Sequence, residues 1–337
     1  MDVTDAQRIE VIESSQVSEA RRRIIAIGLE QGLDQAAIDR LALVSTELAT
    51  NLVKHATGGF LIAQGLKSDD NVGVEIFAMD TGPGMNNVEE CLRDGFSTVG
   101  TLGTGLGAIS RLSDSIEFSS SHKRGTIIIS RLWLKKTELI ETNVCGLTVP
   151  IAGEILSGDK WTTCTIGDSL YCLMVDGLGH GFEASEAAKL AVKRFKDNLS
   201  LAPAQMLKEL HNALRGSRGA VGAVAKIDFE RGELCFAGLG NIAGILLNKL
   251  ERKHLTSLNG TLGYEAQKIT EFRFPWARTS TLIMHSDGLS SRYTDYETLS
   301  GNNAESAAVV AATLYLRQSK KTDDATVLVV KQAEIAS

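Results

Sequence analysis

The chain has 337 residues, of which 43% are hydrophobic and 23% are charged, which suits about two packed domains and excludes a disordered polymer. A net charge of −6 without a basic stripe argues against a nucleic-acid partner, and no apolar run reaches the ~18 residues of a membrane-spanning helix. The five cysteines form no C-x-x-C pair, which predicts reduced thiols in a cytoplasmic protein without a cysteine zinc site.

The first part of the chain predicts a mixed α/β domain. Apolar residues recur at helical spacing over residues 17–31 and again over 34–56, where Asp34 is the expected N-cap. The other expected elements are strands at 60–65, 72–79, 115–119 and 126–134, a helix at 106–112, and a polar loop at 94–105.

A charged, polar stretch marks the domain boundary. We expect a first domain over residues 1–134, a linker over 135–144 and a second domain over 145–332. The second domain is expected to contain strands at 144–151, 161–166, 170–175, 220–228, 233–237, 242–247, 281–285 and 325–331, with helices at 184–198, 203–215 and 305–316.

Three polar residues share one face of the second predicted helix. Glu47, Asn51 and His55 follow one another at intervals of four, which places a carboxylate, an amide and an imidazole on one side of an otherwise apolar helix. From these three residues alone, a solvated polar stripe is as good an explanation as a functional site.

Glycine-rich segments follow later in this domain. Asp80 ends a predicted strand just before Gly82 and Gly84, so its carboxylate can accept a hydrogen bond from a flat base that lies against the backbone. The run Gly103-Thr-Gly105-Leu-Gly107 opens a helix, whose first N–H groups form an anion site suited to phosphates. The hydroxyl of Thr126 is placed to support a purine from the other side.

Two other nucleotide motifs are excluded. Gly103, Gly105 and Ala108 fit the G-x-G-x-x-G/A fingerprint, but that motif should follow directly on an apolar strand, and here it follows the polar segment 96–102. No G-x-x-x-x-G-K-[ST] sequence is present, which excludes a P-loop.

In this order and spacing, the segments resemble the GHKL ATPase superfamily over about residues 15–134, and in particular the RsbT-like anti-sigma-factor serine kinases. Glu47-Leu-Ala-Thr-Asn51-Leu-Val-Lys-His55-Ala looks like the N box, and the two glycine runs look like the two glycine boxes. Gly95-Phe-Ser-Thr98 resembles the ATP lid. The resemblance implies a two-layer α/β sandwich that binds ATP with Mg²⁺.

The resemblance also implies roles for single residues. Asn51 would bind the Mg²⁺, Glu47 would act as the base or orient the nucleophile, and Asp80 would bind the adenine amino group. The other implied nucleotide-binding residues are His55, Gly82, Gly84, Gly103, Gly105, Gly107 and Thr126. A histidine autokinase needs a phosphoacceptor histidine ahead of the N box, and none of the six histidines stands there.

A second group of polar residues lies where strands of the second domain begin or end. Asp176 and Asp287 each end an apolar strand and precede a glycine, Asp159 precedes a strand, and Asp323-Asp324 precedes the last one. A single Asp-Gly pair is more often a turn. Several carboxylates at strand ends can instead converge on one edge of a sheet, where their oxygens suit Mg²⁺ or Mn²⁺. Two such ions can activate water for attack on phosphorus.

Four segments of this domain resemble the SpoIIE/RsbX-type branch of the metal-dependent serine/threonine phosphatases, the PPM class. They are Val175-Asp-Gly-Leu-Gly-His-Gly181, Gly238-Leu-Gly-Asn-Ile242, His285-Ser-Asp-Gly-Leu289 and Asp323-Asp-Ala-Thr-Val327. The resemblance covers about residues 145–332 and implies an αββα sandwich with two Mn²⁺ or Mg²⁺ ions.

By this resemblance, Asp176 bridges both metals and Gly177 contributes its carbonyl. Asp287 and Asp323 hold one metal, with Asp323 preferred to Asp324. Asp159 is a further metal ligand, although it stands in Ser-Gly-Asp where Gly-Gly-Asp is commoner. His180 is expected to shape its loop rather than to act as an acid.

The expected fold class is therefore α/β (α+β), a GHKL sandwich followed by a PPM sandwich. The expected function is a metal-dependent phosphoserine/phosphothreonine protein phosphatase with an ATP-binding, serine-kinase-like regulatory domain. The resemblance implies a phosphorylated STAS-type antagonist as substrate, anti-sigma or switch proteins as further partners, and a bacterial partner-switching pathway. Two alternatives stay open: a protein whose main activity is RsbT-like kinase, and a non-catalytic adaptor that sequesters a sigma factor or antagonist. The oligomeric state is open as well.

Overall fold

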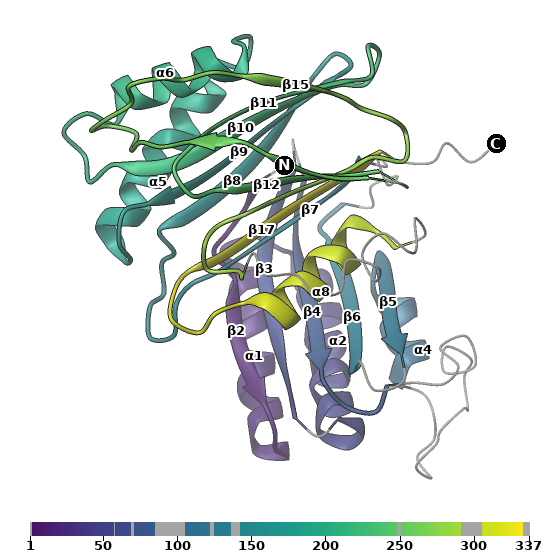
Figure 1. The fold of residues 1–337 in the computed structure, drawn as a ribbon. Helices are drawn as coiled ribbons and strands as arrows, with labels where there is room; N and C mark the ends of the chain where they lie inside the picture. The colour runs from purple at the N-terminus through teal and green to yellow at the C-terminus, as the bar shows by residue number, and fades with distance from the viewer. Residues whose placement is uncertain are drawn as a thin grey trace. The chain divides into compact units, whose positions relative to one another are not determined.

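The computed structural model describes residues 2–56, 58–68, 71–84, 105–121, 125–135, 142–248, 251–290 and 305–332. The chain forms two compact units, one of residues 6–140 and the other of residues 141–337 together with the first five residues (Figure 1). None of the helices in the described ranges combines the length and the apolar composition needed to span a bilayer.

The unit of residues 6–140 is a two-layer sandwich of helices on an antiparallel sheet. Its strands neighbour one another in the order β2, β3, β4, β6 and β5, and α1 and α2 cover one face (Figure 1). The elements are β2 (Gln7–Val11), α1 (Ser14–Glu30), α2 (Gln35–His55), β3 (Gly59–Ser68), β4 (Asn71–Asp80), α4 (Gly105–Leu112), β5 (Ser115–Ser121) and β6 (Gly125–Trp133). The predicted two-layer α/β architecture is confirmed.

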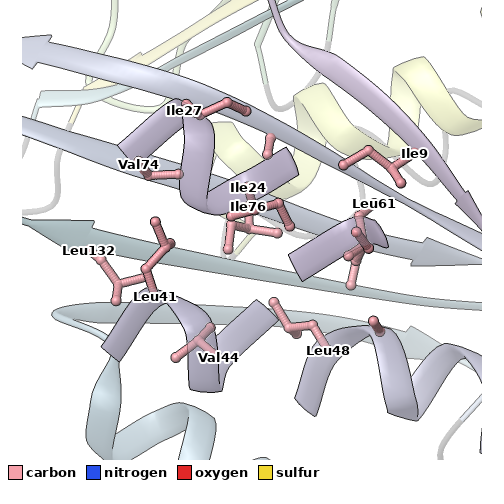
Figure 2. Close-up of a cluster of buried hydrophobic side chains, with 14 of the residues drawn as sticks. Ile9, Ile24, Ile27, Leu41, Val44, Leu48, Leu61, Val74, Ile76 and Leu132 are labelled. Carbon is pink, nitrogen blue, oxygen red and sulfur yellow. The ribbon is translucent and has the colours of Figure 1, made fainter. Parts of the chain in front are cut away.

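The core of this unit lies between the helices and the sheet. Ile24 of α1 and Leu41 and Leu48 of α2 are fully buried there, and they face alternate residues of the central strands, such as Leu61 and Ile76 (Figure 2). Full burial of such a side chain contributes about 1.5–3 kcal/mol, so this apolar stripe holds α2 against the sheet. The polar face of α2 is thereby fixed in position.

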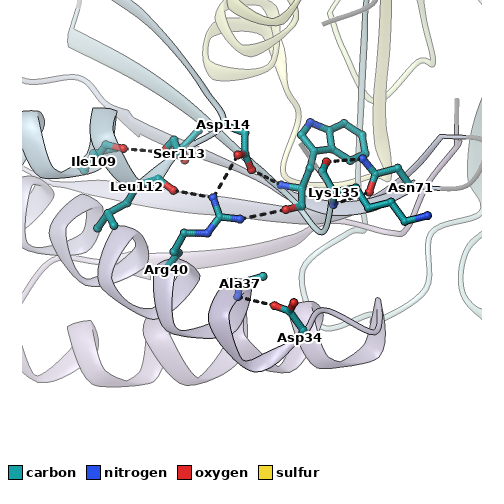
Figure 3. Close-up of polar contacts among 11 residues, drawn as sticks. Asp34, Ala37, Arg40, Asn71, Ile109, Leu112, Ser113, Asp114 and Lys135 are labelled. Atoms are coloured by element: carbon teal, nitrogen blue, oxygen red, sulfur yellow. Dashed lines mark hydrogen bonds and ion pairs between the residues drawn. The ribbon is translucent and has the colours of Figure 1, made fainter. Parts of the chain in front are cut away.

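Polar contacts secure the first turns of α2. Asp34 accepts a hydrogen bond from the N–H of Ala37 at 2.8 Å, which confirms it as the N-cap of α2. Farther along α2, Arg40 pairs with Asp114 at 3.2 Å and donates to the carbonyl of Leu112 at 3.3 Å (Figure 3). Arg40 therefore ties α2 to the end of α4.

The second unit is an αββα sandwich, as predicted. One sheet has the order β14, β11, β10, β9 and β8, with β15 beside β11, and the other has the order β13, β12, β16, β17 and β7. Helices α5 and α6 cover the first sheet, and α8 covers the second. The elements are β7 (Thr142–Val149), β8 (Asp159–Ile166), β9 (Ser169–Gly177), α5 (Phe182–Lys196), α6 (Pro203–Ala213), β10 (Ala220–Asp228), β11 (Glu233–Leu239), β12 (Ala243–Leu247), β13 (Arg252–Leu255), β14 (Ser257–Leu258), β15 (Phe272–Pro275), β16 (Thr281–His285), α8 (Ala307–Gln318) and β17 (Ala325–Gln332).

Alternation along β9 explains the layers of this sandwich. Cys172 and Met174 point into the core between the two sheets, whereas Leu173 and Val175 point into the core beneath α5 and α6. Because both faces are buried, β9 reads as a continuous apolar run that ends at Asp176. The first polar side chain after this run therefore emerges at the edge of the sheet.

The start of the chain differs from the prediction. Residues 1–5 were expected in the first domain, but they belong with the second unit. The carboxylate of Asp2 accepts hydrogen bonds from Thr162 and Lys196, and Asp5 pairs with Lys160. The chain passes from the first unit back to the second between residues 140 and 141, which lies inside the predicted linker. β7 nevertheless begins within that linker, at Thr142.

Candidate active sites

In the first unit, the N box lies beneath the start of α4. Glu47 and Asn51 are half-buried on one face of α2. A Cβ atom on Gly105, the first residue of α4, would stand 3.0 Å from Glu47 Oε2 and 3.5 Å from Asn51 Oδ1. A side chain at position 105 would therefore crowd Glu47 and touch Asn51, and glycine leaves their polar atoms open to a ligand at the N-terminus of α4.

Asp80 is the centre of a second polar group in this unit. Its Oδ1 accepts the N–H of Gly82 at 2.7 Å and the N–H of Thr126 at 3.2 Å, while burial raises the pKa of its carboxyl. Gly125 has φ +84°, and a Cβ there would stand 1.9 Å from the carbonyl oxygen of Asp80. Because both N–H groups use Oδ1, Oδ2 retains acceptor capacity for an amino group.

The other residues predicted to bind the nucleotide lie at the end of α2, after β4, within α4, or outside the described residues. Gly82 packs against the end of α2, since its Cβ would stand 3.3 Å from the Cα of Ala56. His55 is exposed at that helix end, Gly84 has φ +77°, and Gly107 is buried within α4. Gly103 and the lid-like segment 95–98 lie outside the described residues.

In the second unit, carboxylates gather at one end of the sandwich. Asp159 opens β8 and lies directly opposite Asp176 of β9 in the antiparallel register. Burial and the nearby charge of Asp176 raise the pKa of Asp159 well above its usual value. Its buried Oδ2 has no hydrogen-bond partner among the described residues. A buried carboxylate oxygen without a donor requires a proton or a cation.

Asp176 lies within electrostatic reach of carboxylates from the other sheet. Burial, followed by the charges of Asp287, Asp323 and Asp324, raises the pKa of Asp176 to about 7. Asp287 follows β16 and the Asp323-Asp324 pair precedes β17, so these charges come from the sheet that does not contain Asp176. The two sheets thus bring their acidic strand ends to one place, as the positions in the sequence predicted.

Two neighbours position Asp287. Asn241 Nδ2 donates to its Oδ2 at 2.8 Å, and Lys320 Nζ donates to its backbone carbonyl at 2.6 Å. Gly288 packs tightly against the residue before β17: a Cβ on Gly288 would stand 1.8 Å from the carbonyl oxygen of Asp324. Asn241 lies in the Gly238–Ile242 segment of the phosphatase resemblance but had no expected role of its own; its amide, at a strand end beside a carboxylate motif, is the signal that could have assigned it one.

Asp323 and Asp324 are in different surroundings. Asp324 is buried, and its two oxygens accept the N–H of Ile151 at 2.7 Å and the N–H of Gly158 at 2.6 Å. Asp323 is half-buried, and burial together with the charge of Asp287 raises the pKa of its carboxyl. Asp324 therefore ties the segment before β8 to β17, while Asp323 faces the other acidic groups.

The loop after Asp176 is packed closely against its surroundings. Gly177 donates its N–H to Gly158 at 3.0 Å, and a Cβ on Gly177 would stand 2.3 Å from the carbonyl oxygen of Ala184. His180 is exposed and contacts Glu154 at 3.0 Å through Nδ1. In the described part of the chain, no three Asp, Glu, His or Cys side chains already form a closed ligand cage.

Comparisons with known proteins support both resemblances. Residues 12–131 match the histidine kinase-like ATPase domain, and residues 167–333 match Stage II sporulation protein E. Serine/threonine-protein kinase RsbT of Bacillus subtilis (strain 168) is 29% identical over 133 residues, which cover 40% of this chain and 100% of RsbT. Phosphoserine phosphatase RsbX of the same organism is 28% identical over 159 residues, which cover 47% of this chain and 78% of RsbX.

A solved structure agrees with the fold of the second unit. A crystal structure of RsbX in complex with magnesium is 23% identical, covers 55% of this chain and 92% of that chain, and superposes with a TM-score of 0.50. The chain joins a histidine kinase-like ATPase domain to a serine/threonine phosphatase domain of the SpoIIE family.

Proposed function

We propose that this protein hydrolyses phosphoserine or phosphothreonine on a partner protein, with divalent metal ions held by the carboxylates of the second unit. The observation that carries the proposal is the pair of the buried Asp159 and the half-buried Asp176, which lie opposite each other while Asp287 and Asp323 add further negative charge. Such a group is costly unless cations or protons offset the repulsion. Hard oxygen ligands of this kind suit Mg²⁺ or Mn²⁺.

The residues present fit two such ions. Asp176 would bind both ions and the carbonyl of Gly177 would add a further ligand. Asp159 offers a buried oxygen without a donor, and Asp287 and Asp323 would hold one ion. When bound, the ions supply an activated water and offset the charge of the phosphate. The protein's own task is to hold the carboxylates still: Asn241 orients Asp287, and Asp324 keeps the segment that leads to Asp159 in place.

The first unit supports a proposal of ATP binding with Mg²⁺. Asn51 would bind the Mg²⁺, Asp80 would accept a hydrogen bond from the adenine amino group, and Glu47 would act as the base or orient a nucleophile. The position of Gly105 above Glu47 and Asn51 supports this, since it leaves both side chains open toward the start of α4. We propose that this domain regulates the phosphatase.

A kinase activity is the second candidate, because Glu47 and Asn51 are both present and both lie beside the start of α4. Incubation with labelled ATP and a STAS-type protein separates the two roles of the first unit. Transfer of label that is lost in Asn51→Ala supports a kinase. Nucleotide binding without transfer, with a phosphatase rate that depends on ATP, supports a regulatory domain.

The substrate proposal rests on the relatives. One resembles the first unit and is named a serine/threonine-protein kinase, and the other resembles the second unit and is named a phosphoserine phosphatase. We propose a phosphorylated STAS-type antagonist as the shared target, with anti-sigma or switch proteins as further cytoplasmic partners. Two opposed phosphoryl-transfer reactions in one chain suit a partner-switching pathway.

The phosphatase proposal is tested by phosphate release from a phosphoserine peptide with Mn²⁺ or with a chelator. The expected result is hydrolysis that requires the metal and is lost in Asp287→Asn. The matched control is Asp197→Asn, which changes an exposed aspartate at the end of α5 and should leave the rate intact. Equal rates with and without the metal would overturn the proposal.

A further inference from the structure

Three large apolar side chains are exposed around the loop that follows Asp176. Leu178 is 38% exposed, Phe182 at the first turn of α5 is 68% exposed, and Ile155 in the segment before β8 is 84% exposed. Phe195 of the same helix is fully buried, so α5 does not need Phe182 to attach to the sheet. Apolar residues gathered at one place on a surface mark a contact site more often than isolated ones do.

One backbone hydrogen bond and one side-chain contact anchor the loop that carries these side chains. Leu178 donates its N–H to the carbonyl of Gly219 at 3.1 Å. Glu154 contacts His180 at 3.0 Å, which brings the neighbouring Ile155 to the same loop. The loop is therefore tied on two sides, and the apolar groups are presented without a large ordering cost when something binds them.

A cation lies against the same loop. The guanidinium of Arg218 is so close to Gly179 that a Cβ there would stand 2.9 Å from Nη2, and Nη1 donates to Glu183 at 2.7 Å. Arg218 is exposed, so the guanidinium can exchange this surface ion pair at little cost. The acidic groups beyond the loop would repel a phosphate dianion, and a positive charge at the rim offsets that repulsion.

We propose that Ile155, Leu178, Phe182 and Arg218 form a docking rim for the polypeptide segment that carries the phosphorylated serine. The segment would place an apolar side chain that flanks the phosphoserine on Phe182 and its neighbours, while Arg218 attracts the phosphate. The inference rests on the proposed phosphatase function, because the rim surrounds the loop that contains Asp176. It adds a sequence preference to that function.

The test uses two phosphoserine nonapeptides that differ only at the positions two residues before and after the phosphoserine. One peptide has leucine there and the other has serine. The protein is expected to hydrolyse the leucine peptide with about tenfold higher kcat/KM, which is the size expected for partial burial of one leucine side chain. In Phe182→Ala, the ratio between the two peptides should fall to about twofold.

Leu190→Ala is the matched control, since Leu190 is a 40% exposed leucine farther along α5 and should leave the tenfold ratio unchanged. Arg218→Ala should raise KM for both peptides alike, and Arg218→Lys should restore most of the loss. Equal hydrolysis of the two peptides by the unmodified protein, or an undiminished ratio in Phe182→Ala, would overturn the docking rim alone. No hydrolysis of either peptide with Mn²⁺ would overturn the proposed function and the rim with it.

Discussion

Asp159 and Asp176 lie directly opposite each other across β8 and β9, and both carboxyl groups have raised pKa values. Like charges at directly opposed positions of a sheet repel, and burial strengthens the repulsion. This pair therefore lowers the stability of the metal-free fold, and its negative charge attracts cations to the same place.

Removing one of the two charges should stabilise the metal-free protein. In Asp176→Asn, the neutral amide replaces a carboxylate whose pKa is raised to about 7 by burial and by Asp287 and Asp323. The free energy of unfolding of the second unit at pH 8 should rise, by at most about 4 kcal/mol. Thermal denaturation in a chelator measures this change. A lower melting temperature than that of the unmodified protein would contradict the account.

Stability and metal affinity should depend on pH in opposite directions. Between the ordinary aspartate pKa of 3.8 and about 7, Asp176 keeps its proton in the folded protein and loses it in the unfolded chain. The folded state then binds more protons, so the stability of the metal-free protein falls as the pH rises through this window. Mn²⁺ competes with the same proton, so its affinity should rise with pH toward 8. Denaturation and Mn²⁺ titrations at pH 5, 6, 7 and 8 test both trends, and a flat profile would contradict them.

The close approach at Gly125 should make this position intolerant of any side chain. Gly125→Ala places a Cβ 1.9 Å from the carbonyl oxygen of Asp80 at φ +84°, and it should destabilise the first unit by about 3 kcal/mol. Gly32→Ala is the control, since Gly32 has φ +78° with no atom within 4 Å of the added Cβ. It should cost about 1 kcal/mol. Equal losses in urea denaturation would show that the contact with Asp80 is unimportant.

The neighbours Asp323 and Asp324 should respond differently to the same substitution. An asparagine at position 324 can accept only one of the two N–H groups, from Ile151 and Gly158, and should cost about 1–3 kcal/mol of stability. Asp323→Asn should leave stability within about 0.5 kcal/mol and lower Mn²⁺ affinity by about tenfold or more. Paired denaturation and Mn²⁺ titrations test this division. The reverse pattern would make Asp324 the ligand.

Asp80→Asn should separate nucleotide binding from folding. The amide oxygen can still accept the N–H groups of Gly82 and Thr126, but the other acceptor becomes a donor. The affinity for ATP should fall by about tenfold to a hundredfold without a change in melting temperature. Glu47→Gln should keep ATP binding, since Glu47 is proposed to act on the reaction. Calorimetric titration with ATP distinguishes the two variants.

Long, strongly patterned elements could be predicted from the sequence. The apolar stripe of α2 and the cap at Asp34 placed this helix almost to the residue, and the buried run before Asp176 placed β9. The strand β2 was missed, because its two apolar residues form too short a pattern and its partner β3 lies far along the chain. The short strands β13, β14 and β15 were also not predicted. They form because they pair with other strands, and their own sequences have no clear strand pattern.

The candidate sites were predictable to a similar degree. Carboxylates at strand ends pointed to one acidic edge, and the sandwich brings four of them within electrostatic reach of one another. The supporting contacts were not predictable, because they depend on how closely the two sheets approach. The bond from Asn241 to Asp287 and the two N–H groups bound by Asp324 are of this kind. The placement of residues 1–5 was missed because it depends on ion pairs with lysines far along the chain.

The central claim is that the acidic edge of the second unit is a metal-dependent phosphoserine phosphatase site. The most direct measurement is phosphate release from a phosphoserine peptide as a function of Mn²⁺ concentration, for the unmodified protein and for Asp176→Asn. We predict saturable, Mn²⁺-dependent release by the unmodified protein and no release by Asp176→Asn, even though that variant is folded and more stable without metal. Normal Mn²⁺-dependent release by Asp176→Asn would contradict the account.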